Sequence, residues 1–182
     1  SVRWSSEQIV IVSGIQQAID LLARFLLKTG DPVWMEDPGY FGATIAFASA
    51  GARMVGVPVD EEGLSVSAGK KLCPHAKGVY LTPAHQFPLG VTMSLERRMA
   101  LLDWASRSGA FVIEDDYDSE YRFEGQPVPS LQSLDENSNV ILIGSFSKTL
   151  FPSLRLGYIV MPPSLVDYFL SFRNRTDFRN LN

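Results

Sequence analysis

Cysteine is nearly absent from this sequence, since Cys73 is the single one in 182 residues. One thiol cannot form a disulfide within the chain, which excludes the disulfide-stapled secreted domains and favours a reducing, cytoplasmic location. Long apolar runs are also missing, so no stretch has the length of a membrane-spanning helix. The first letters, SVRWSSEQ, lack the charged-then-apolar pattern of a secretory signal peptide.

An excess of positive charge is lacking as well. Lys and Arg total 16 against 20 Asp and Glu, for a net charge of −4. This balance argues against a nucleic-acid surface on the chain itself, because such surfaces neutralise phosphates with clustered basic residues. Arg173, Arg175 and Arg179 do cluster, and we interpret them as a solvated helix end or a boundary of the chain.

Apolar material for a folded core is plentiful. Hydrophobic residues make up 46% and aromatic residues 11% of the chain, which excludes intrinsic disorder. The length suits one compact domain, and no repeat or internal linker divides it. Because the sequence begins without Met, we expect it to be a fragment of a longer protein.

Short apolar runs alternate with amphipathic helical patterns, and polar letters follow the ends of the runs. This order predicts an α/β fold, a mostly parallel sheet sandwiched by helices, with ligands at the carboxyl edge of the strands. Residues 59–63 are expected to form a turn and residues 121–138 an ordered loop. Strands are expected at residues 7–13, 33–35, 53–57, 78–82, 110–115, 140–143 and 156–161, and helices at 14–30, 41–50, 65–72, 94–108 and from 164 past 172.

One buried strand leads directly into GSFSKTLFPSLRLGY, residues 144–158. Lys148 there lies between two predicted buried strands, and burial lowers the pKa of an ammonium group, as an amine nucleophile requires. Ser145, Ser147 and Arg155 are able to bind a dianionic phosphate. A lysine for a Schiff base beside a phosphate cradle is the minimum equipment for pyridoxal 5'-phosphate (PLP). On spacing alone, an ordinary charged surface loop is an equal alternative.

Two segments nearer the start also place binding groups after strands. In SGIQQAID, the N–H groups of Gly14, Ile15 and Gln16 lie at the positive end of a predicted helix, which is a ready anion site. In EDPGY, Tyr40 follows a strand and is able to lie flat on a planar ligand ring. The alternatives are a ligand-free turn for the first segment and a core tyrosine for the second.

The loop TPAHQFPLG contains two prolines and a glycine that force an irregular path. His85 and Gln86 are its only strong hydrogen-bonding side chains, although a histidine satisfied within the loop is equally consistent. In AFVIEDDYD, where the strand at residues 110–115 leads into acidic residues, a period of two puts Asp115 and Tyr117 on the same side if the extended geometry continues. A carboxylate against a pyridine nitrogen keeps that nitrogen protonated. An acidic turn is the alternative, and no ligand spacing supports a metal site.

These motifs together resemble a known family. SFSKTLFPSLRLGY resembles the PLP-lysine segment of fold-type I aminotransferases, and more narrowly that of the MocR family, GntR-type transcription regulators with an aminotransferase-like effector domain. EDDYDSEYR and TPAHQFPLGVTMS match the same family in the same order. The resemblance fades beyond Arg173.

The resemblance implies a role for each candidate residue. Lys148 would form the internal aldimine, Asp115 would pair with the pyridine nitrogen, with Asp116 as the fallback, and Tyr117 would contact the phenolic oxygen. The usual asparagine-proline pattern is replaced near His85, so the donor from that loop stays open between His85 and Gln86. Tyr40 would stack on the ring, and the phosphate would be held by Gly14, Ile15, Gln16, Ser145, Ser147 and Arg155.

We therefore interpret residues 1–182 as the PLP-binding large domain of a MocR/GntR-type regulator. The alternative is a working aminotransferase, in which Lys148 moves the proton. A module that has lost the cofactor is disfavoured by the intact set of Lys148, Asp115 and Arg155. The resemblance implies an amino compound as ligand, a homodimer and no membrane partner. It implies DNA binding only through an N-terminal winged helix-turn-helix, which these residues lack, as they lack the small C-terminal domain.

Overall fold

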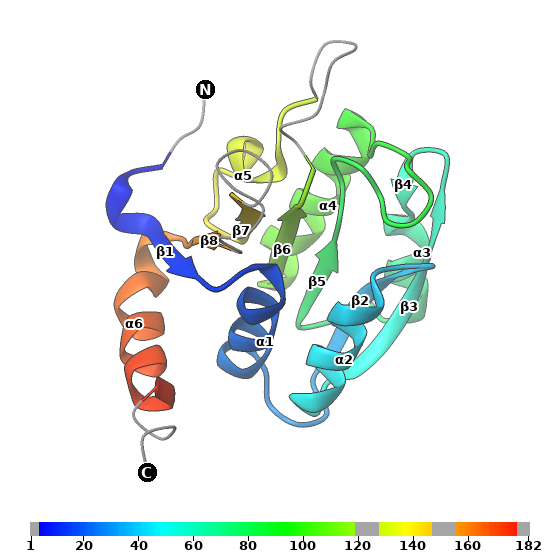
Figure 1. Ribbon diagram of the computed structural model, residues 1–182. Coiled ribbons are helices and arrows are strands. Elements are labelled where there is room, and N and C mark those ends of the chain that lie inside the picture. The colour runs from blue at the N-terminus through cyan, green and yellow to red at the C-terminus, as the bar shows by residue number, and fades with distance from the viewer. Residues whose placement is uncertain (1–3, 119–127, 147–155, 178–182) are drawn as a thin grey trace.

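The computed structural model describes residues 4–118, 128–146 and 156–177. Their core is an eight-stranded sheet with the order β1-β8-β7-β6-β5-β2-β3-β4 (Figure 1). The strands are β1 (Ile9–Val12), β2 (Pro32–Asp37), β3 (Arg53–Asp60), β4 (Gly63–Leu64), β5 (Gly78–Leu81), β6 (Phe111–Asp116), β7 (Val140–Ser145) and β8 (Gly157–Val160). The helices are α1 (Ile15–Leu26), α2 (Phe41–Ser49), α3 (Val66–Leu72), α4 (Leu95–Ser108), α5 (Leu131–Leu134) and α6 (Pro163–Asp177), after a 3-10 turn at Ser6–Gln8.

The middle of the sheet is parallel. Strands β3, β2, β5, β6 and β7 run the same way, whereas β8 is antiparallel to both β7 and β1, and β4 is antiparallel to β3. The predicted α/β class with a mostly parallel sheet is thereby confirmed. Helical crossovers between parallel strands bring their carboxyl ends to one edge of the sheet, where ligands bind in open α/β folds.

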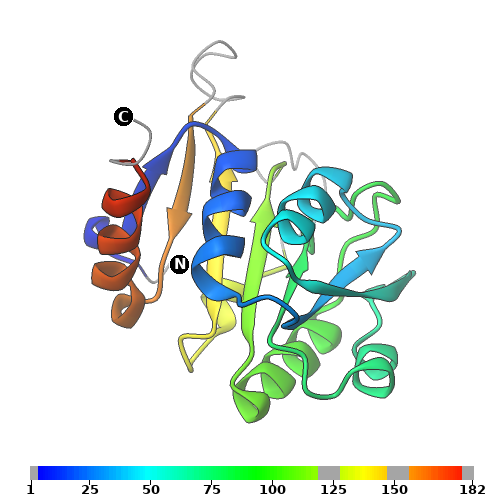
Figure 2. The ribbon, with the colours of Figure 1, turned by 90° about the horizontal axis from the view of Figure 1, so that it is seen from below.

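Helices cover both faces of the sheet. The cluster on one face packs α1, α2 and α6 against the strands, and the cluster on the other face packs α3, α4 and α5 (Figure 2). Strand β6 shows why both faces are apolar, because Val112 belongs to one cluster and its neighbour Ile113 to the other, both fully buried. On the second face, Trp34 and Trp104 stack with their ring centroids 3.8 Å apart.

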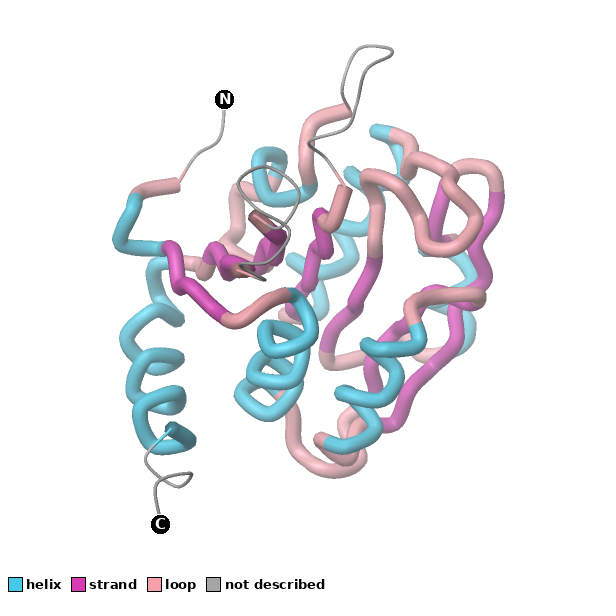
Figure 3. The backbone as a smooth tube through the Cα atoms, in the orientation of Figure 1, coloured by secondary structure: helices cyan, strands magenta, loops and turns pink. Residues whose placement is uncertain are grey.

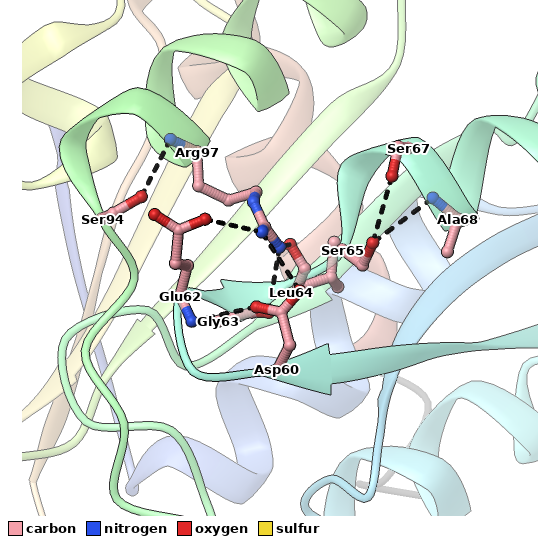
Figure 4. A network of polar contacts seen from close by, with 9 residues as sticks. All are labelled: Asp60, Glu62, Gly63, Leu64, Ser65, Ser67, Ala68, Ser94 and Arg97. Carbon is pink, nitrogen blue, oxygen red and sulfur yellow. Dashed lines mark hydrogen bonds and ion pairs between the residues drawn. The ribbon is translucent and has the colours of Figure 1, made fainter.

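Two adjacent arginines fasten α4 in different ways. Arg98 is 1% exposed, donates to the carbonyls of Met93 and Pro83, and lies 3.6 Å from the buried Glu114 carboxylate. Arg97 is partly exposed and reaches the β3–β4 hairpin (Figure 4), where it pairs with Asp60 and Glu62.

The structure differs from the sequence-based prediction at two places, the β3–β4 hairpin and helix α5. The turn expected at residues 59–63 is present but narrower, at Glu61 and Glu62, because β3 continues to Asp60 and pairs with β4. Arg97 stabilises this hairpin, since it pairs with Asp60 and Glu62 and donates to both carbonyls of β4. Helix α5 lies within the expected loop at 121–138. Ser130 caps its start, because the Ser130 hydroxyl accepts from the Ser133 N–H, and four residues are too few to show a helical period.

Loops at the carboxyl ends of β2, β5 and β6 meet at one edge of the sheet, beside the start of α1 (Figure 3). These loops contain several of the polar residues that were predicted from the sequence to form the ligand site. None of the helices among the described residues has the length and apolar composition that crossing a bilayer requires.

Candidate functional site

A cavity of about 230 Å³ opens at this carboxyl edge. It lies between the start of α1 and the ends of β2, β5 and β6, so segments far apart in the sequence build it together. Its described lining combines aromatic and apolar walls with a few polar groups, as small-molecule sites do. The lining residues are Ile15, Tyr40, Thr82, Phe87, Asp115 and Tyr117.

Asp115 is the acidic group of the cavity and is only 3% exposed. Its Oδ2 accepts a 2.5 Å hydrogen bond from the Tyr80 hydroxyl, whereas its buried Oδ1 has no hydrogen-bond partner in the described part of the chain. Burial raises the pKa of Asp115 to about 7, and the Tyr80 hydrogen bond opposes that rise, while the charges of Asp116 and Glu36 add to it. A buried acceptor left unpaired beside a cavity is suited to a donor on a ligand.

Tyr117 lies on the same cavity two residues further along. The period of two that put Asp115 and Tyr117 on one side therefore brings both side chains to one place. The Tyr117 hydroxyl donates to the His85 carbonyl at 2.8 Å. Burial raises the pKa of Tyr117, with smaller contributions from Asp118, Asp115 and Glu36.

Tyr40 is held on the cavity wall by Gln16. The Tyr40 hydroxyl donates to Gln16 Oε1 at 3.2 Å, and Gln16 Nε2 donates to the Gly42 carbonyl at 2.9 Å. A Cβ added at Gly42 would come within 2.5 Å of both side chains, so glycine is needed for this arrangement. The side chain of Gln16 thus positions an aromatic ring, a function that its sequence position did not suggest.

The start of α1 faces the same cavity through Ile15. Gly14 precedes the helix with φ 110°, a conformation that a residue with a side chain rarely adopts. The N–H groups of the first helical turn have no acceptor within the helix, and the helix dipole makes this end positive. The structure therefore brings the predicted anion-binding turn to the predicted aromatic and acidic residues.

The loop after β5 contributes Phe87 to the cavity rather than its polar side chains. Gln86 is 1% exposed, and its amide is occupied by the carbonyls of Pro38 and Phe87 and by the N–H of Leu89. His85 is not among the lining residues, and its Nδ1 lies 2.9 Å from Asp118 Oδ2. A contact of His85 with a cofactor stays a prediction.

Behind this loop lies a second buried carboxyl, Glu36. Its Oε2 accepts from the Thr82 N–H at 3.1 Å and from the Thr82 hydroxyl at 2.8 Å. Thr82 Oγ1 in turn accepts from the Phe87 N–H at 3.0 Å. Burial raises the pKa of Glu36 to about 7 against the lowering effect of these bonds. This chain of bonds fixes the place of Phe87 on the cavity wall.

Three predicted site residues, Ser147, Lys148 and Arg155, lie outside the described residues. The described residues that flank them are joined, because the Phe146 N–H donates to the Leu156 carbonyl at 2.9 Å. The hydroxyl of Ser145, at the end of β7, lies 3.5 Å from the same Leu156 carbonyl. This end of β7 adjoins β6, where Asp115 pairs with Ile143.

Three residues of the site were missed from the sequence: Tyr80, Thr82 and Phe87. Tyr80 stood in a run interpreted only as a buried strand. One signal was available, since a buried tyrosine hydroxyl needs a partner. Its partner depends on the pairing of β5 with β6, which a single sequence does not reveal. Among the described residues, no cluster of His, Cys, Asp and Glu is able to hold a metal ion.

Comparison with known proteins agrees with this geometry. The family model of aminotransferase class I and II matches residues 2–178. The chain is 49% identical over 168 residues to the probable rhizopine catabolism regulatory protein MocR of Rhizobium meliloti, a match that covers 92% of this chain and 34% of that protein. The chain thus spans about a third of the length of the curated relatives that it matches.

Solved aminotransferases share the fold. Kynurenine aminotransferase of Pyrococcus horikoshii, in complex with PMP, superposes with a TM-score of 0.85 at 37% identity, covering 92% of this chain and 43% of that one. LysN, the alpha-aminoadipate aminotransferase of Thermus thermophilus, complexed with N-(5'-phosphopyridoxyl)-L-leucine, gives a TM-score of 0.86 at 35% identity, covering 94% and 45%.

Proposed function

Because the chain belongs to the class I and II aminotransferase family, we propose that its cavity binds PLP and that residues 1–182 form the cofactor-binding large domain of a fold-type I protein. This proposal rests on the surroundings of one atom, Asp115 Oδ1. It is a buried carboxylate oxygen without a hydrogen-bond partner in the described chain, on a residue that lines a cavity. A protonated pyridine nitrogen supplies the donor and the positive charge that such an oxygen lacks.

The other lining residues fit the same ligand. The Tyr40 ring, held by Gln16, offers a flat surface for an aromatic ring. Tyr117 lies on the same cavity, and its hydroxyl would have to turn from the His85 carbonyl to donate to the phenolic oxygen. When bound, PLP acts as an electron sink for the carbon that bears an amino group. Asp115 would keep a proton on the ring nitrogen, because the ring must be protonated there to act as an electron sink.

The phosphate group would lie at the start of α1. The N–H groups of Gly14, Ile15 and Gln16 and the hydroxyl of Ser145 are the described candidates to hold it. Ser147 and Arg155 are assigned to it from the sequence alone. The Lys148 amine would be the group that bonds covalently to the cofactor and then carries protons during chemistry. Phe146 and Leu156, the described residues that precede and follow the segment containing Lys148 in the sequence, are hydrogen-bonded to each other at the end of β7.

Titration of the protein with PLP tests the part of Asp115. Asp115→Asn keeps the shape of the side chain and removes its charge, so we expect PLP to bind about ten- to a hundredfold more weakly, the value of a hydrogen bond to a charged group. Asp116→Asn is the matched control, because Asp116 is adjacent but does not line the cavity. Equal affinity in wild type and Asp115→Asn would remove Asp115 from the site. A larger loss in Asp116→Asn would assign the nitrogen partner to Asp116.

For the whole protein, we propose an effector domain of a MocR/GntR-type regulator that senses PLP or an amino compound. The 49% identity to a regulator supports this choice over an enzyme. In such a protein, DNA binding would belong to an N-terminal winged helix-turn-helix, and the functional form would be a homodimer. The second candidate is an aminotransferase, because enzymes of that class superpose at 35 to 37% identity.

One pair of assays distinguishes these two functions. A regulator is expected to change its affinity for DNA upstream of its own gene when PLP or an amino compound is added, with little turnover. An enzyme is expected to convert amino acids to keto acids with many turnovers per site. Sustained turnover without any effect on DNA binding would contradict the regulator proposal.

A further inference from the structure

Behind Asp115 lies a phenol that the cofactor proposal leaves unused. Tyr80, in the middle of β5, is 1% exposed, and its hydroxyl donates to Asp115 Oδ2 at 2.5 Å. Strands β5 and β6 are parallel, with Tyr80 opposite Ile113, so Asp115 lies two residues further along on the same face. The rings of Tyr80 and Phe47 lie 5.9 Å apart, centroid to centroid, which helps to fix the phenol in the core.

The two oxygens of Asp115 are consequently not equivalent. Oδ2 is bonded to the phenol, whereas Oδ1 is buried without a hydrogen-bond partner in the described chain. A carboxyl group rotates about its last bond unless a neighbour fixes it. The phenol also donates a hydrogen bond to an oxygen that carries negative charge, which favours the ionised form of the carboxyl.

We propose that Tyr80 is a positioning residue for the cofactor: its hydroxyl holds Asp115 Oδ2 so that Oδ1 is presented to the ring nitrogen as an ionised acceptor. This inference rests on the proposed PLP site and assigns a new residue to it. Tyr80 does not line the cavity, so it acts through Asp115 alone.

The charges around Asp115 give this hydrogen bond its importance. Glu36 at the end of β2 and Asp116 on β6 both oppose ionisation of Asp115, as does burial itself. Tyr117, just after β6, and Tyr40, at the start of α2, are the other titratable residues in the described lining of the cavity. Among the described groups, the Tyr80 hydroxyl is the one that lowers the pKa of Asp115. Without it, Asp115 should take up its proton at a higher pH and lose its charge there.

The test compares PLP affinity across pH in wild type and Tyr80→Phe, which keeps the ring and removes only the hydroxyl. We expect affinity about tenfold weaker near neutral pH. We also expect the pH below which affinity falls to move upwards, which a merely structural change would not cause. Trp104→Phe is the control, because it removes a donor to the Pro74 carbonyl from the opposite core cluster. It should leave both readouts unchanged.

A double-mutant cycle examines the route through Asp115. In an Asp115→Asn background, Tyr80→Phe should have little further effect on affinity. If Tyr80→Phe does not fold, 3-fluorotyrosine at position 80 keeps the shape and donates more strongly, and the pH of half-loss should then move downwards.

The outcomes separate this inference from the cofactor proposal. Unchanged affinity and pH profile in folded Tyr80→Phe, with normal PLP binding by the wild type, would overturn the role of Tyr80 alone. A loss of affinity without any shift of the pH profile would reduce Tyr80 to a packing residue. A wild-type protein that does not bind PLP would overturn both.

Discussion

Glu36 and Asp115 lie buried beside one cavity, and their surroundings make them behave unlike surface carboxyls. Each is at most 7% exposed, and burial raises the pKa of both to about 7. The two carboxyl groups differ in their hydrogen-bond partners. Glu36 accepts two hydrogen bonds from Thr82 through one oxygen and so shapes the cavity wall, whereas Asp115, which lines the cavity, has one buried oxygen without a hydrogen-bond partner among the described residues.

Glu36 gives a prediction on stability. Its pKa is about 7 in the folded protein against an ordinary value of 4.5, so between these pH values the folded protein holds a proton on Glu36 that the unfolded chain has lost. Stability is therefore fully present below about pH 4.5 and falls as pH rises toward 7, by on the order of 3 kcal/mol from this group. Glu36→Gln should make the free energy of unfolding less dependent on pH between 5 and 8, measured by urea denaturation of the ligand-free protein.

The control for Glu36 is Glu96→Gln, which removes an exposed carboxyl from α4. Its pH dependence of stability should match that of the wild type. The slope should not vanish entirely in Glu36→Gln, because burial raises the pKa of Asp115 as well. An identical slope in Glu36→Gln and wild type would contradict the account of Glu36 as a buried, proton-holding group.

At the residue scale, the polar side chains at the ends of strands could be predicted from the sequence, whereas the buried side chains behind the cavity could not. The positions of Asp115 and Tyr117 on one cavity follow from the period of two in an extended strand. Tyr80 and Glu36 interact with partners 35 and 46 residues away, and only strand pairing brings them there. Gln16 was proposed as a phosphate contact, and its link to Tyr40 needed the packing of α1 on α2.

At the element scale, α4 is fastened by one buried and one exposed ion pair. The Arg98–Glu114 pair has side chains 1% and 2% exposed, and Glu114 also accepts the N–H groups of Leu131 and Gln132 at the start of α5. Glu114 therefore links α4, β6 and α5. The pairs of Arg97 with the β3–β4 hairpin face solvent on their acidic side.

Removing the buried cation should be far more costly than removing the exposed one. Arg98→Met leaves Glu114 without its counter-charge and is expected to destabilise the fold by about 3–5 kcal/mol. Arg97→Met, one residue earlier on the same helix, should cost about 1 kcal/mol. Denaturant unfolding of both variants measures the difference.

A second substitution checks the cause. Adding Glu114→Gln to Arg98→Met removes the stranded charge and should recover part of the lost stability. Similar losses in Arg98→Met and Arg97→Met, or no recovery in the double variant, would contradict a role for the buried pair in joining α4 to β6.

Most elements were predictable because their apolar patterns are long and end in turn residues. The strands at residues 78–82 and 110–115 and the helix at 94–108 were expected within a residue or two of β5, β6 and α4. The misses are elements fixed by distant partners. Helix α5 is organised by Glu114, and the β3–β4 hairpin by Arg97, neither of which a local pattern contains.

At the scale of the whole molecule, the sheet order brings α1, β2, β5 and β6 to one edge, and the cavity exists only because they meet there. The family is shown by a match over residues 2–178, while the chain spans about a third of its curated relatives. The proposed sensing, control of DNA binding and transamination all depend on one claim, that PLP binds at this edge of the sheet.

That claim is tested most directly by reducing the PLP-treated protein with borohydride and mapping the modified peptide by mass spectrometry. The account predicts one added cofactor per chain, on Lys148, and its loss in Lys148→Ala. The chain offers internal competitors, because Lys28, Lys70, Lys71 and Lys77 are all exposed and none lines the cavity. Modification spread over those four lysines, or unchanged in Lys148→Ala, would contradict a PLP site at this edge of the sheet.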